Sequence, residues 1–206
     1  MKYSKILKER FKKKFIKYGK NLKSLGWDNK QNQNKRFEIA VKNLKFDNKK
    51  TILDIGCGFG DLCKFLKKKN ILYKNYLGLD LNQVFQKKNI NKRDKFLSMD
   101  FYKDNIYSNF DYVFLIGLFN FNFGSKKKNY DYMLKMLRKA YKKTNKTLIF
   151  DFISFENSRN LKNDKFIHYY KLKEVIDMCF KISKKISIDH NYKKIPKTEC
   201  SIKLYK

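Results

Sequence analysis

Three glycines alternate with other residues directly after the apolar run Thr51–Ile55, and a segment with helical spacing begins behind them near Asp61. These glycines are Gly56, Gly58 and Gly60. Glycine lets the backbone turn tightly and approach a ligand where a Cβ would collide. The first turn of the helix adds free N–H groups and the positive end of its dipole. The pattern predicts a loop for a nucleotide-like ligand, although its spacing differs from the dinucleotide G-x-G-x-x-G.

An acidic residue ends the next apolar segment, Tyr76–Asp80. At this place in an α/β sheet, a carboxylate can accept both hydroxyls of a ribose. Asp80 therefore predicts that the ligand contains adenosine.

A second acid follows the apolar segment after that, where Asp100 and Phe101 come just behind Lys95–Ser98. Asp100 is placed to meet an adenine amino group, and Phe101 is able to stack on the base. The alternative for Asp100 is a simple cap of a turn or a helix, and it stays open at this point.

Short apolar runs and helical patterns alternate from Thr51 onward, which is typical of βα units and a parallel sheet. Strands are expected at Thr51–Ile55, Tyr76–Leu79, Lys95–Ser98, Tyr112–Ile116, Thr147–Phe152, Ile182–Ile188 and Ser201–Tyr205. Helices are expected at Asp61–Lys69, Gln83–Asn89, Lys127–Lys143 and Lys171–Phe180. The last strand should return as a hairpin through a short turn that contains Pro196.

Two further helices should precede this core. The first has apolar residues at helical spacing between Tyr3 and Tyr18, and Gly19 can end it. The second runs through Phe37 to Leu44. At 206 residues the chain has the length of one domain, with a helical cap over residues 1–48 and an α/β core over residues 49–206.

These segments, taken in order, resemble the successive motifs of class I S-adenosylmethionine-dependent methyltransferases. The resemblance rests on L-D-I-G-C-G-F-G-D, Y-L-G-L-D, M-D-F and F-D-Y-V-F-L-I-G-L-F-N. It implies a doubly wound, Rossmann-like α/β fold with a seven-stranded sheet whose last strand is antiparallel. It also implies S-adenosylmethionine as cofactor and S-adenosylhomocysteine as product.

The resemblance assigns cofactor contacts to residues of these motifs. They are Asp54, Gly56, Cys57, Gly58, Asp80, Leu81, Asp100, Phe101 and Ile116. Arg36 precedes the loop by the interval seen in ubiquinone-pathway O-methyltransferases, where an arginine grips the methionine carboxylate. Arg36 as a surface residue of its helix is the other reading, and both stay open.

A wider likeness covers nearly the whole chain, and it is to small bacterial methyltransferase-like proteins of undefined substrate. Segments on both sides of the core carry it, among them Y-G-K-N-L-K-S-L-G-W, N-K-R-F-E, H-Y-Y and D-H-N-Y. Such a likeness fixes a family without fixing an acceptor.

Methyl transfer from a sulfonium is an in-line displacement, so holding the acceptor in line supplies most of the catalysis, and no metal is needed. An oxygen acceptor usually needs a base, and the two histidines, His168 and His190, are candidates. For each, packing or capping without chemistry is at least as good a reading. Asn120 follows the fourth strand, at the end of the sheet where ligands bind, and is expected to contact the acceptor or the cofactor.

Four aromatic residues are candidates for the wall of the site, although aromatics are abundant enough that each is more readily structural. They are Trp27, Tyr169, Tyr170 and Tyr192. The chain lacks both an Asp/Asn-Pro-Pro-Tyr motif after the fourth strand and a Pro-Cys pair, which argues against those two classes of base-methylating enzyme.

The formal net charge of +31 would ordinarily indicate nucleic acid as a partner. The excess is nearly all lysine, comes with abundant Asn, Ile, Phe and Tyr, and is spread along the chain, so AT-rich coding is the favoured explanation. Clustering of lysines at the mouth of the site would support a polyanionic acceptor, and an even distribution would support coding bias.

The favoured function is methylation of a small-molecule or biosynthetic-precursor acceptor, whose charge stays open. The alternative is a protein that binds or methylates RNA through its basic surface. With no apolar stretch long enough for a signal or a span, a cytoplasmic protein with reduced, metal-free cysteines is expected. The methylated atom and the oligomeric state are open.

Overall fold

The computed structural model describes residues 2–85, 93–156, 164–190 and 199–206. The chain divides into two compact units, residues 1–107 and residues 108–206. Each unit is taken by itself below.

Three parallel strands form the sheet portion of the first unit: β1 (Thr51–Ile55), β2 (Asn75–Asp80) and β3 (Asp94–Ser98). β1 pairs with β2 from Thr51 opposite Asn75, and β2 pairs with β3 from Tyr76 opposite Asp94. Most of β1 is buried, as its continuous apolar sequence predicts for a strand covered on both faces.

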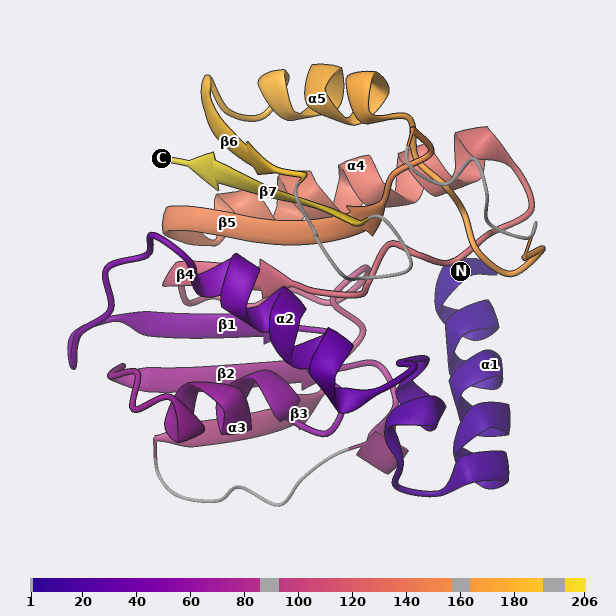
Figure 1. Cartoon of the computed structure of the whole chain (residues 1–206), viewed down its shortest axis with the longest axis horizontal. Coiled ribbons are helices and arrows are strands. Elements are labelled where there is room, and N and C mark those ends of the chain that lie inside the picture. The colour runs from indigo at the N-terminus through magenta and orange to yellow at the C-terminus, as the bar shows by residue number, and fades with distance from the viewer. Residues whose placement is uncertain (1, 86–92, 157–163, 191–198) are drawn as a thin grey trace. The chain divides into compact units, whose positions relative to one another are not determined.

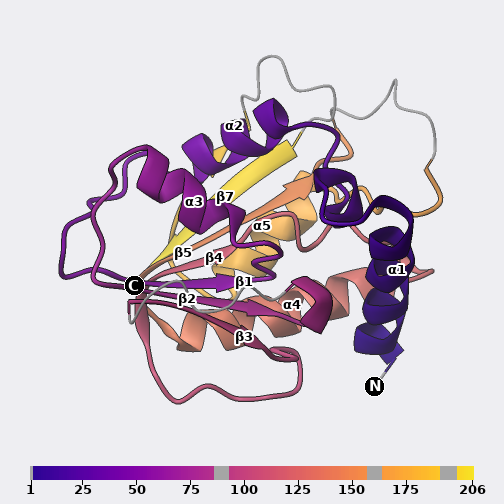
Figure 2. The same cartoon turned by 90° about the horizontal axis from the view of Figure 1, so that it is seen from below.

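The helices of the first unit are α1 (Lys2–Tyr18), η1 (Leu22–Leu25), α2 (Lys30–Val41), α3 (Asp61–Lys68) and the short η2 (Gln83–Phe85). α2 and α3 lie on one face of β1–β3, and α1 lies across the carboxyl ends of these strands (Figures 1 and 2). Side-chain oxygens of Asn21 and Asn29 cap η1 and α2, and Gly19, at φ +60°, follows the end of α1 as predicted.

Aromatic contacts hold these helices in place. Phe37 of α2 packs on Phe65 of α3 at 5.5 Å between ring centroids. Phe15 of α1 lies 6.3 Å from Phe59 of the glycine loop. Tyr3, near the start of α1, contacts Tyr102 at 5.4 Å. The helical cap is thus packed directly on the loop that follows β1.

The second unit contains β4 (Phe110–Leu115), α4 (Lys126–Lys142), β5 (Thr144–Ile153), α5 (Leu172–Phe180), β6 (Lys185–Asp189) and β7 (Glu199–Tyr205). β4 and β5 are parallel, whereas β7 runs antiparallel to both β5 and β6. α4 contacts β5 and buries Met133, Met136 and Leu137. α5 contacts β6.

The seven strands follow the order β3-β2-β1-β4-β5-β7-β6. This order and the antiparallel β7 confirm the predicted α/β fold and its final hairpin. The division at residue 48 into a cap and a core stays a prediction. No helix among the described residues combines the length and apolar character that a membrane crossing requires.

Most predicted bounds differ from those in the structure by one to three residues. Three elements show clear differences. α2 ends at Val41 instead of Leu44, and Asn43 just behind it has a left-handed φ of +62°. The predicted helix Gln83–Asn89 is a 3-10 turn over residues 83–85, and residues 86–89 lie outside the described part. The strand expected from Ile182 begins at Lys185, because the amides of residues 182 and 183 both donate to the carbonyl of Cys179 and close α5. Pro196 also lies outside the described residues.

Gly78 in the middle of β2 tests how tightly the first unit is packed. A Cβ at this position would lie 2.7 Å from Cδ1 of Phe96 and 2.9 Å from Sγ of Cys57. We expect Gly78→Ala to lower the free energy of unfolding by about 1–3 kcal/mol, because an overpacked core must shift. Urea unfolding measures the loss, and Phe96→Leu in the same chain should recover part of it. A cost below about 0.5 kcal/mol for the single variant would contradict this packing.

Candidate functional site

Three backbone amides of the glycine loop donate hydrogen bonds to the end of β2, and one amide just after β2 adds a fourth bond there. The amides of Gly56 and Cys57 donate to the carbonyl of Leu79 at 2.8 and 3.0 Å. The amide of Gly58 donates to Oδ2 of Asp80 at 2.9 Å, and the amide of Asn82 donates to Oδ1 at 2.8 Å. The carboxylate of Asp80 is therefore fixed at the carboxyl end of the strands, beside the glycine loop.

The side chain of Asp80 is nearly buried, at 9% exposure. Burial raises its pKa to about 6, against the lowering effect of the amide hydrogen bonds from Asn82 and Gly58. A carboxylate offers about four lone-pair positions, and the two amides occupy one on each oxygen. The side chain of Asn82 makes a further hydrogen bond to the carboxylate. The acceptor capacity that remains is suited to a ribose hydroxyl.

All three loop glycines have a positive φ: Gly56 at +80°, Gly58 at +51° and Gly60 at +67°. Space is restricted at the last two. A Cβ on Gly58 would lie 3.0 Å from methyl carbons of Leu25 in η1, and a Cβ on Gly60 would lie 2.6 Å from the ring of Phe96. Both conformation and space therefore demand glycine here. Leu25 shows that the cap covers the loop at Gly58.

Asp54, the fourth residue of β1, is buried beneath the loop and accepts a hydrogen bond from the hydroxyl of Tyr76 on β2. Burial raises the pKa of Asp54 to about 7, the Tyr76 hydrogen bond opposes that rise, and the charges of Asp80 and Asp61 add to it. Asp54 thus links β1 to β2 directly beneath the loop. Its predicted contact with the cofactor stays a prediction.

The thiol of Cys57 lies in the loop, and burial raises its pKa well above the ordinary value. Such a thiol stays protonated and is a poor nucleophile. The carried-over roles of Cys57 and of Leu81, which follows Asp80 and is half-buried, are contacts to the cofactor only.

Arg36 is buried on α2, with 8% exposure, and its guanidinium carbon lies 4.4 Å from the ring centroid of Trp27. Burial contradicts the reading of Arg36 as a surface residue of its helix. A buried arginine stacked on an aromatic ring is suited to bind a carboxylate in a fixed geometry. Trp27 also packs on Phe37, at 6.4 Å between ring centroids, and its expected place in the wall of the site stays a prediction.

Asp100 and Phe101 follow β3 in the same unit. Phe101 is buried, whereas Asp100 is half-buried and its Oδ2 lies 3.4 Å from Nζ of Lys103. The carbonyl of Asp100 accepts from the amides of Lys103 and Asp104, so a turn does begin at this residue. The proposed contact of its carboxylate with adenine stays a prediction.

In the second unit, the segment behind β4 is held by polar contacts. Ile116 is buried, and the amide of Gly117 donates to Oδ1 of Asp151 at 2.6 Å. Asn120 accepts twice: from the amide of Ile153 through Oδ1 and from the amide of His168 through its carbonyl, both at 3.2 Å. Asn120 therefore ties the end of β4 to the end of β5 and to the segment that contains His168, which sequence reasoning missed.

The two histidines differ in environment. The ring of His168 meets Tyr170 and Tyr130 edge-on at 4.5 and 5.9 Å, and burial lowers its pKa to about 4. Its Nε2 has no hydrogen-bond partner in the part of the chain that the structure describes. His190 directly follows β6 and is half-buried. Burial acts to raise the pKa of Glu156, but hydrogen bonds from Ser154 and the amide of Leu172 outweigh it and lower that pKa, with His190 contributing least.

The tyrosines predicted to line the site also differ in their burial. Tyr170 is fully buried and packs among Phe152, Tyr130 and His168, so it belongs to the core. Tyr169 is half-buried, and Tyr192 lies outside the described residues. The described residues contain no group of three His, Cys, Asp or Glu side chains that would hold a metal ion.

Comparison with known proteins gives one family. The family model described as mycolic acid cyclopropane synthetase matches residues 23–175, which include the glycine loop, Asp80, Asn120 and His168. No curated protein matches the chain by sequence at a significant level.

Solved structures match over nearly the whole chain. Magnesium protoporphyrin IX methyltransferase from Synechocystis PCC 6803 with bound S-adenosylhomocysteine has a TM-score of 0.66 at 10% identity, over 98% of this chain and 99% of that one. With bound S-adenosylmethionine the same enzyme gives a TM-score of 0.67 at 12% identity, over 98% and 96%. A methyltransferase from Clostridium acetobutylicum ATCC 824 gives 0.60 at 19% identity, over 95% and 98%. These likenesses concern the fold.

Asp54 makes the stability of the protein depend on pH. Its pKa is about 7 in the folded protein and near 3.8 in an unfolded chain. Between these values the folded state holds a proton that the unfolded state has released, so the free energy of unfolding falls as the pH rises through this window. Asp54→Asn keeps an acceptor for Tyr76 but never ionises. Between pH 5 and pH 8, we expect the free energy of unfolding to fall by at least about 1 kcal/mol less in Asp54→Asn than in the wild type.

Urea unfolding at the two pH values measures this difference. Asp47→Asn is a matched control, because Asp47 is near the surface and a hydrogen bond from Lys50 lowers its pKa, so it does not titrate in this window. Parallel pH profiles for wild type and Asp54→Asn would contradict the assignment.

Proposed function

We propose an acceptor class and residue roles for this chain. The premise is that the chain belongs to the mycolic acid cyclopropane synthetase family, a family of S-adenosylmethionine-dependent methyltransferases. The chain is accordingly an S-adenosylmethionine-dependent methyltransferase. What we propose is that it transfers the methyl group to a small-molecule or biosynthetic-precursor acceptor.

The observation that carries the cofactor assignment is the fixed carboxylate of Asp80. The backbone amides of Gly58 and Asn82 hold its two oxygens, and the Asn82 side chain adds a further hydrogen bond. We assign the acceptor capacity that remains to the ribose hydroxyls. Since the groups are fixed before the ligand arrives, little ordering is required on binding.

The rest of the cofactor is assigned to residues around this point. The loop backbone at Gly56 and Gly58 would pass close to the methionine part, and Arg36 would bind its carboxylate. Asp100 would meet the adenine amino group, with Phe101 packed against the base. Residues proposed to line the site are Asp54, Cys57, Leu81 and Ile116.

When bound, S-adenosylmethionine supplies an electrophilic methyl group on a sulfonium. The task of the protein is to hold an acceptor atom in line with that methyl group and to take a proton from it where one must leave. We assign the removal of this proton to His190 in preference to His168. A histidine whose pKa is about 4 is unprotonated at neutral pH but is a weak base.

Asn120 is assigned to the acceptor through its amide nitrogen Nδ2, since Oδ1 already accepts from the amide of Ile153. The same residue holds the segment that carries His168. We therefore propose that Asn120 both orients this segment and donates to an acceptor oxygen.

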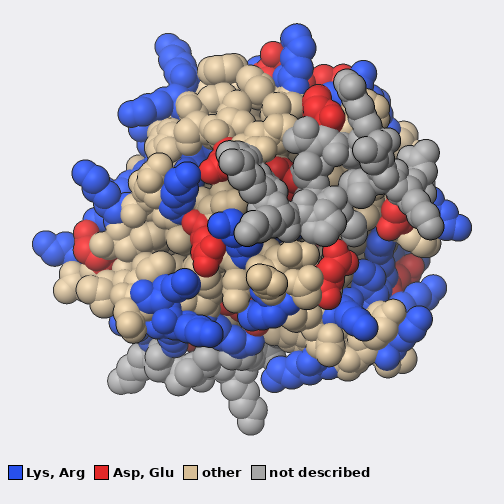
Figure 3. Space-filling view, in the orientation of Figure 1, with Lys and Arg blue, Asp and Glu red and all other residues tan. Residues whose placement is uncertain are grey.

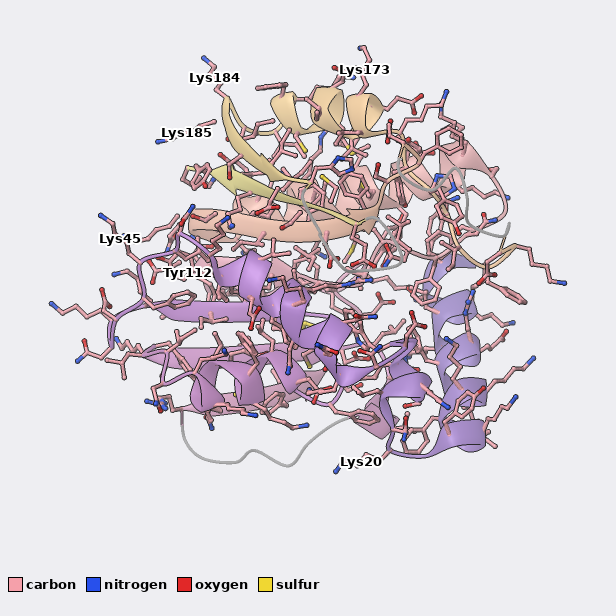
Figure 4. The ribbon with its side chains drawn as sticks, in the orientation of Figure 1. Lys20, Lys45, Tyr112, Lys173, Lys184 and Lys185 are labelled. Carbon is pink, nitrogen blue, oxygen red and sulfur yellow. The ribbon has the colours of Figure 1, made fainter. Side chains whose placement is uncertain are left out.

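The distribution of lysines supports a small acceptor over RNA. Lys and Arg side chains are spread over the face that Figure 3 presents, with Asp and Glu among them. Lysines from separate parts of the chain project outward (Figure 4). Among them are Lys20, which follows α1 in the sequence, Lys45, which precedes β1, and Lys173 on α5. Magnesium protoporphyrin IX methyltransferase, a structural neighbour, is itself named for a small acceptor.

Asp80→Ala tests the cofactor assignment. We expect it to weaken S-adenosylmethionine binding by at least about 100-fold, because two hydrogen bonds to a charged group are lost. Isothermal titration calorimetry measures both affinities, and Asp131→Ala, which alters an exposed carboxylate of α4, should bind like the wild type. Undetectable binding by the wild type would end the proposal, and equal binding by Asp80→Ala would remove Asp80 from the site.

Asn120→Ala and His190→Ala test the acceptor side. A screen of metabolites and of RNA with labelled cofactor first identifies an acceptor. With it, we expect turnover to fall by about 100-fold in each variant, while cofactor affinity stays within about twofold. This is the scale of a lost general base for His190 and of a lost hydrogen-bond donor for Asn120. Unchanged rates in both variants would mean that the acceptor binds elsewhere, and labelling of RNA alone would favour the alternative function.

A further inference from the structure

Four polar side chains connect α2 to the start of α3, and we call them the cap clamp: Lys30, Gln33, Asp61 and Lys64. Nε2 of Gln33 donates to Oδ2 of Asp61 at 3.3 Å, and Oε1 of Gln33 accepts from Nζ of Lys30 at 2.7 Å. Nζ of Lys64 donates to Oδ1 of Asp61 at 2.7 Å, and Nζ of Lys30 lies 3.7 Å from the same oxygen.

The central pair of the cap clamp is buried, since Gln33 is 1% and Asp61 is 6% exposed. A buried amide and carboxylate are costly unless each is hydrogen-bonded. Burial acts to raise the pKa of Asp61, but the hydrogen bond and charge of Lys64 and the charge of Lys30 outweigh it and lower that pKa. The carboxylate therefore stays ionised at neutral pH, and the half-exposed lysines compensate its charge.

The cap clamp lies beside two groups to which a cofactor role is assigned. Asp61 is the first residue of α3 and directly follows Gly60 of the glycine loop. Gln33 precedes Arg36 by three residues, so the two side chains lie on the same face of α2. The hydrogen bond between Gln33 and Asp61 thus fixes the turn of α2 that carries Arg36 against the helix that begins at the loop.

Apolar packing one turn further on, between Phe37 and Phe65, also joins α2 to α3. Such packing is not directional and would allow α2 to rotate about its axis. A hydrogen bond between two buried side chains adds a direction. The side chain of Arg36 is confined against Trp27 and cannot readily change its direction relative to α2. A rotation of α2 would therefore move the guanidinium of Arg36 with it.

We propose that Gln33 and Asp61 are positioning residues that orient Arg36 toward the carboxylate of the cofactor's methionine part. This inference rests on the proposed function of Arg36 and Asp80. Lys30 and Lys64 have a second part in it, because they hold the charge of Asp61, which would otherwise compete with the cofactor carboxylate for Arg36.

Two ligands that differ only at the methionine end test this inference. S-adenosylhomocysteine has the amino-acid carboxylate, and 5′-methylthioadenosine has the same adenosine and thioether without it. In Gln33→Leu, we expect S-adenosylhomocysteine to bind about 10-fold more weakly, as for a misplaced charged hydrogen bond, and 5′-methylthioadenosine to bind within about twofold of wild type. Calorimetry gives both affinities, and Asp61→Asn, which removes the charge but keeps an acceptor for Gln33, should give a smaller loss with the same selectivity.

Two controls separate positioning from general support. Glu38→Gln removes an exposed ion pair, Lys69–Glu38 at 3.5 Å, which joins α2 to the residue that follows α3 and lies outside the cap clamp. It should change neither affinity. In an Arg36→Met background, Gln33→Leu should cause no further loss of S-adenosylhomocysteine affinity, because there is no guanidinium left to position.

Equal weakening of the two ligands in Gln33→Leu, or unchanged binding of both, would overturn the positioning role. So would a full additional loss in the Arg36→Met background. If Gln33→Leu does not fold, the same comparison with Asp61→Asn decides, and selectivity absent there overturns the proposal. Failure of the wild type to bind either ligand would instead overturn the proposed function.

Discussion

The carboxylate of Asp80 accepts one hydrogen bond from the amide of Gly58 through Oδ2 and another from the amide of Asn82 through Oδ1. This arrangement requires β2 to end beside the glycine loop, which the parallel pairing of β1 with β2 provides. It also requires the left-handed backbone at Gly58. The contact fixes an acidic group beside a glycine-rich loop. The site therefore suits a ligand that carries a diol next to a part that passes close to the backbone.

The helical cap is constrained by the same loop. Leu25 of η1 packs on Gly58, Phe15 of α1 on Phe59, and Gln33 of α2 reaches Asp61 just behind Gly60. The cap is therefore fitted to the loop residue by residue. Beneath the loop, Asp54 is held by Tyr76, and its raised pKa lowers the stability of the folded protein at neutral pH. A carboxylic acid retained at such a cost supports the loop by its shape and hydrogen bond.

The sequence was sufficient for features that depend on local pattern. The bounds of β1, Thr51–Ile55, match the prediction, because a continuous apolar run followed by glycine fits few structures other than a buried strand and a turn. The seven-stranded sheet and the antiparallel β7 were implied by the resemblance to a family, whereas the order of the strands comes from the structure. The contacts of Gln33 with Asp61 and of Tyr76 with Asp54 join residues 28 and 22 positions apart, and neither residue type at its position marks such a partner. The spacing of Gln33 and Arg36 on one helix face is a signal that was available. Arg36 is buried and lies against Trp27, nine residues earlier, and that contact is not visible in composition.

The acceptor side is defined by a different kind of contact. Asn120 joins the ends of β4 and β5 to the segment with His168, so its position follows from the backbone it holds. The central claim concerns the cofactor, and a crystal structure of the protein with S-adenosylhomocysteine tests it most directly. The account predicts both ribose hydroxyls within hydrogen-bond distance of Asp80, with the amides of Gly58 and Asn82 still donating to the same carboxylate. A ribose bound away from Asp80 would contradict it.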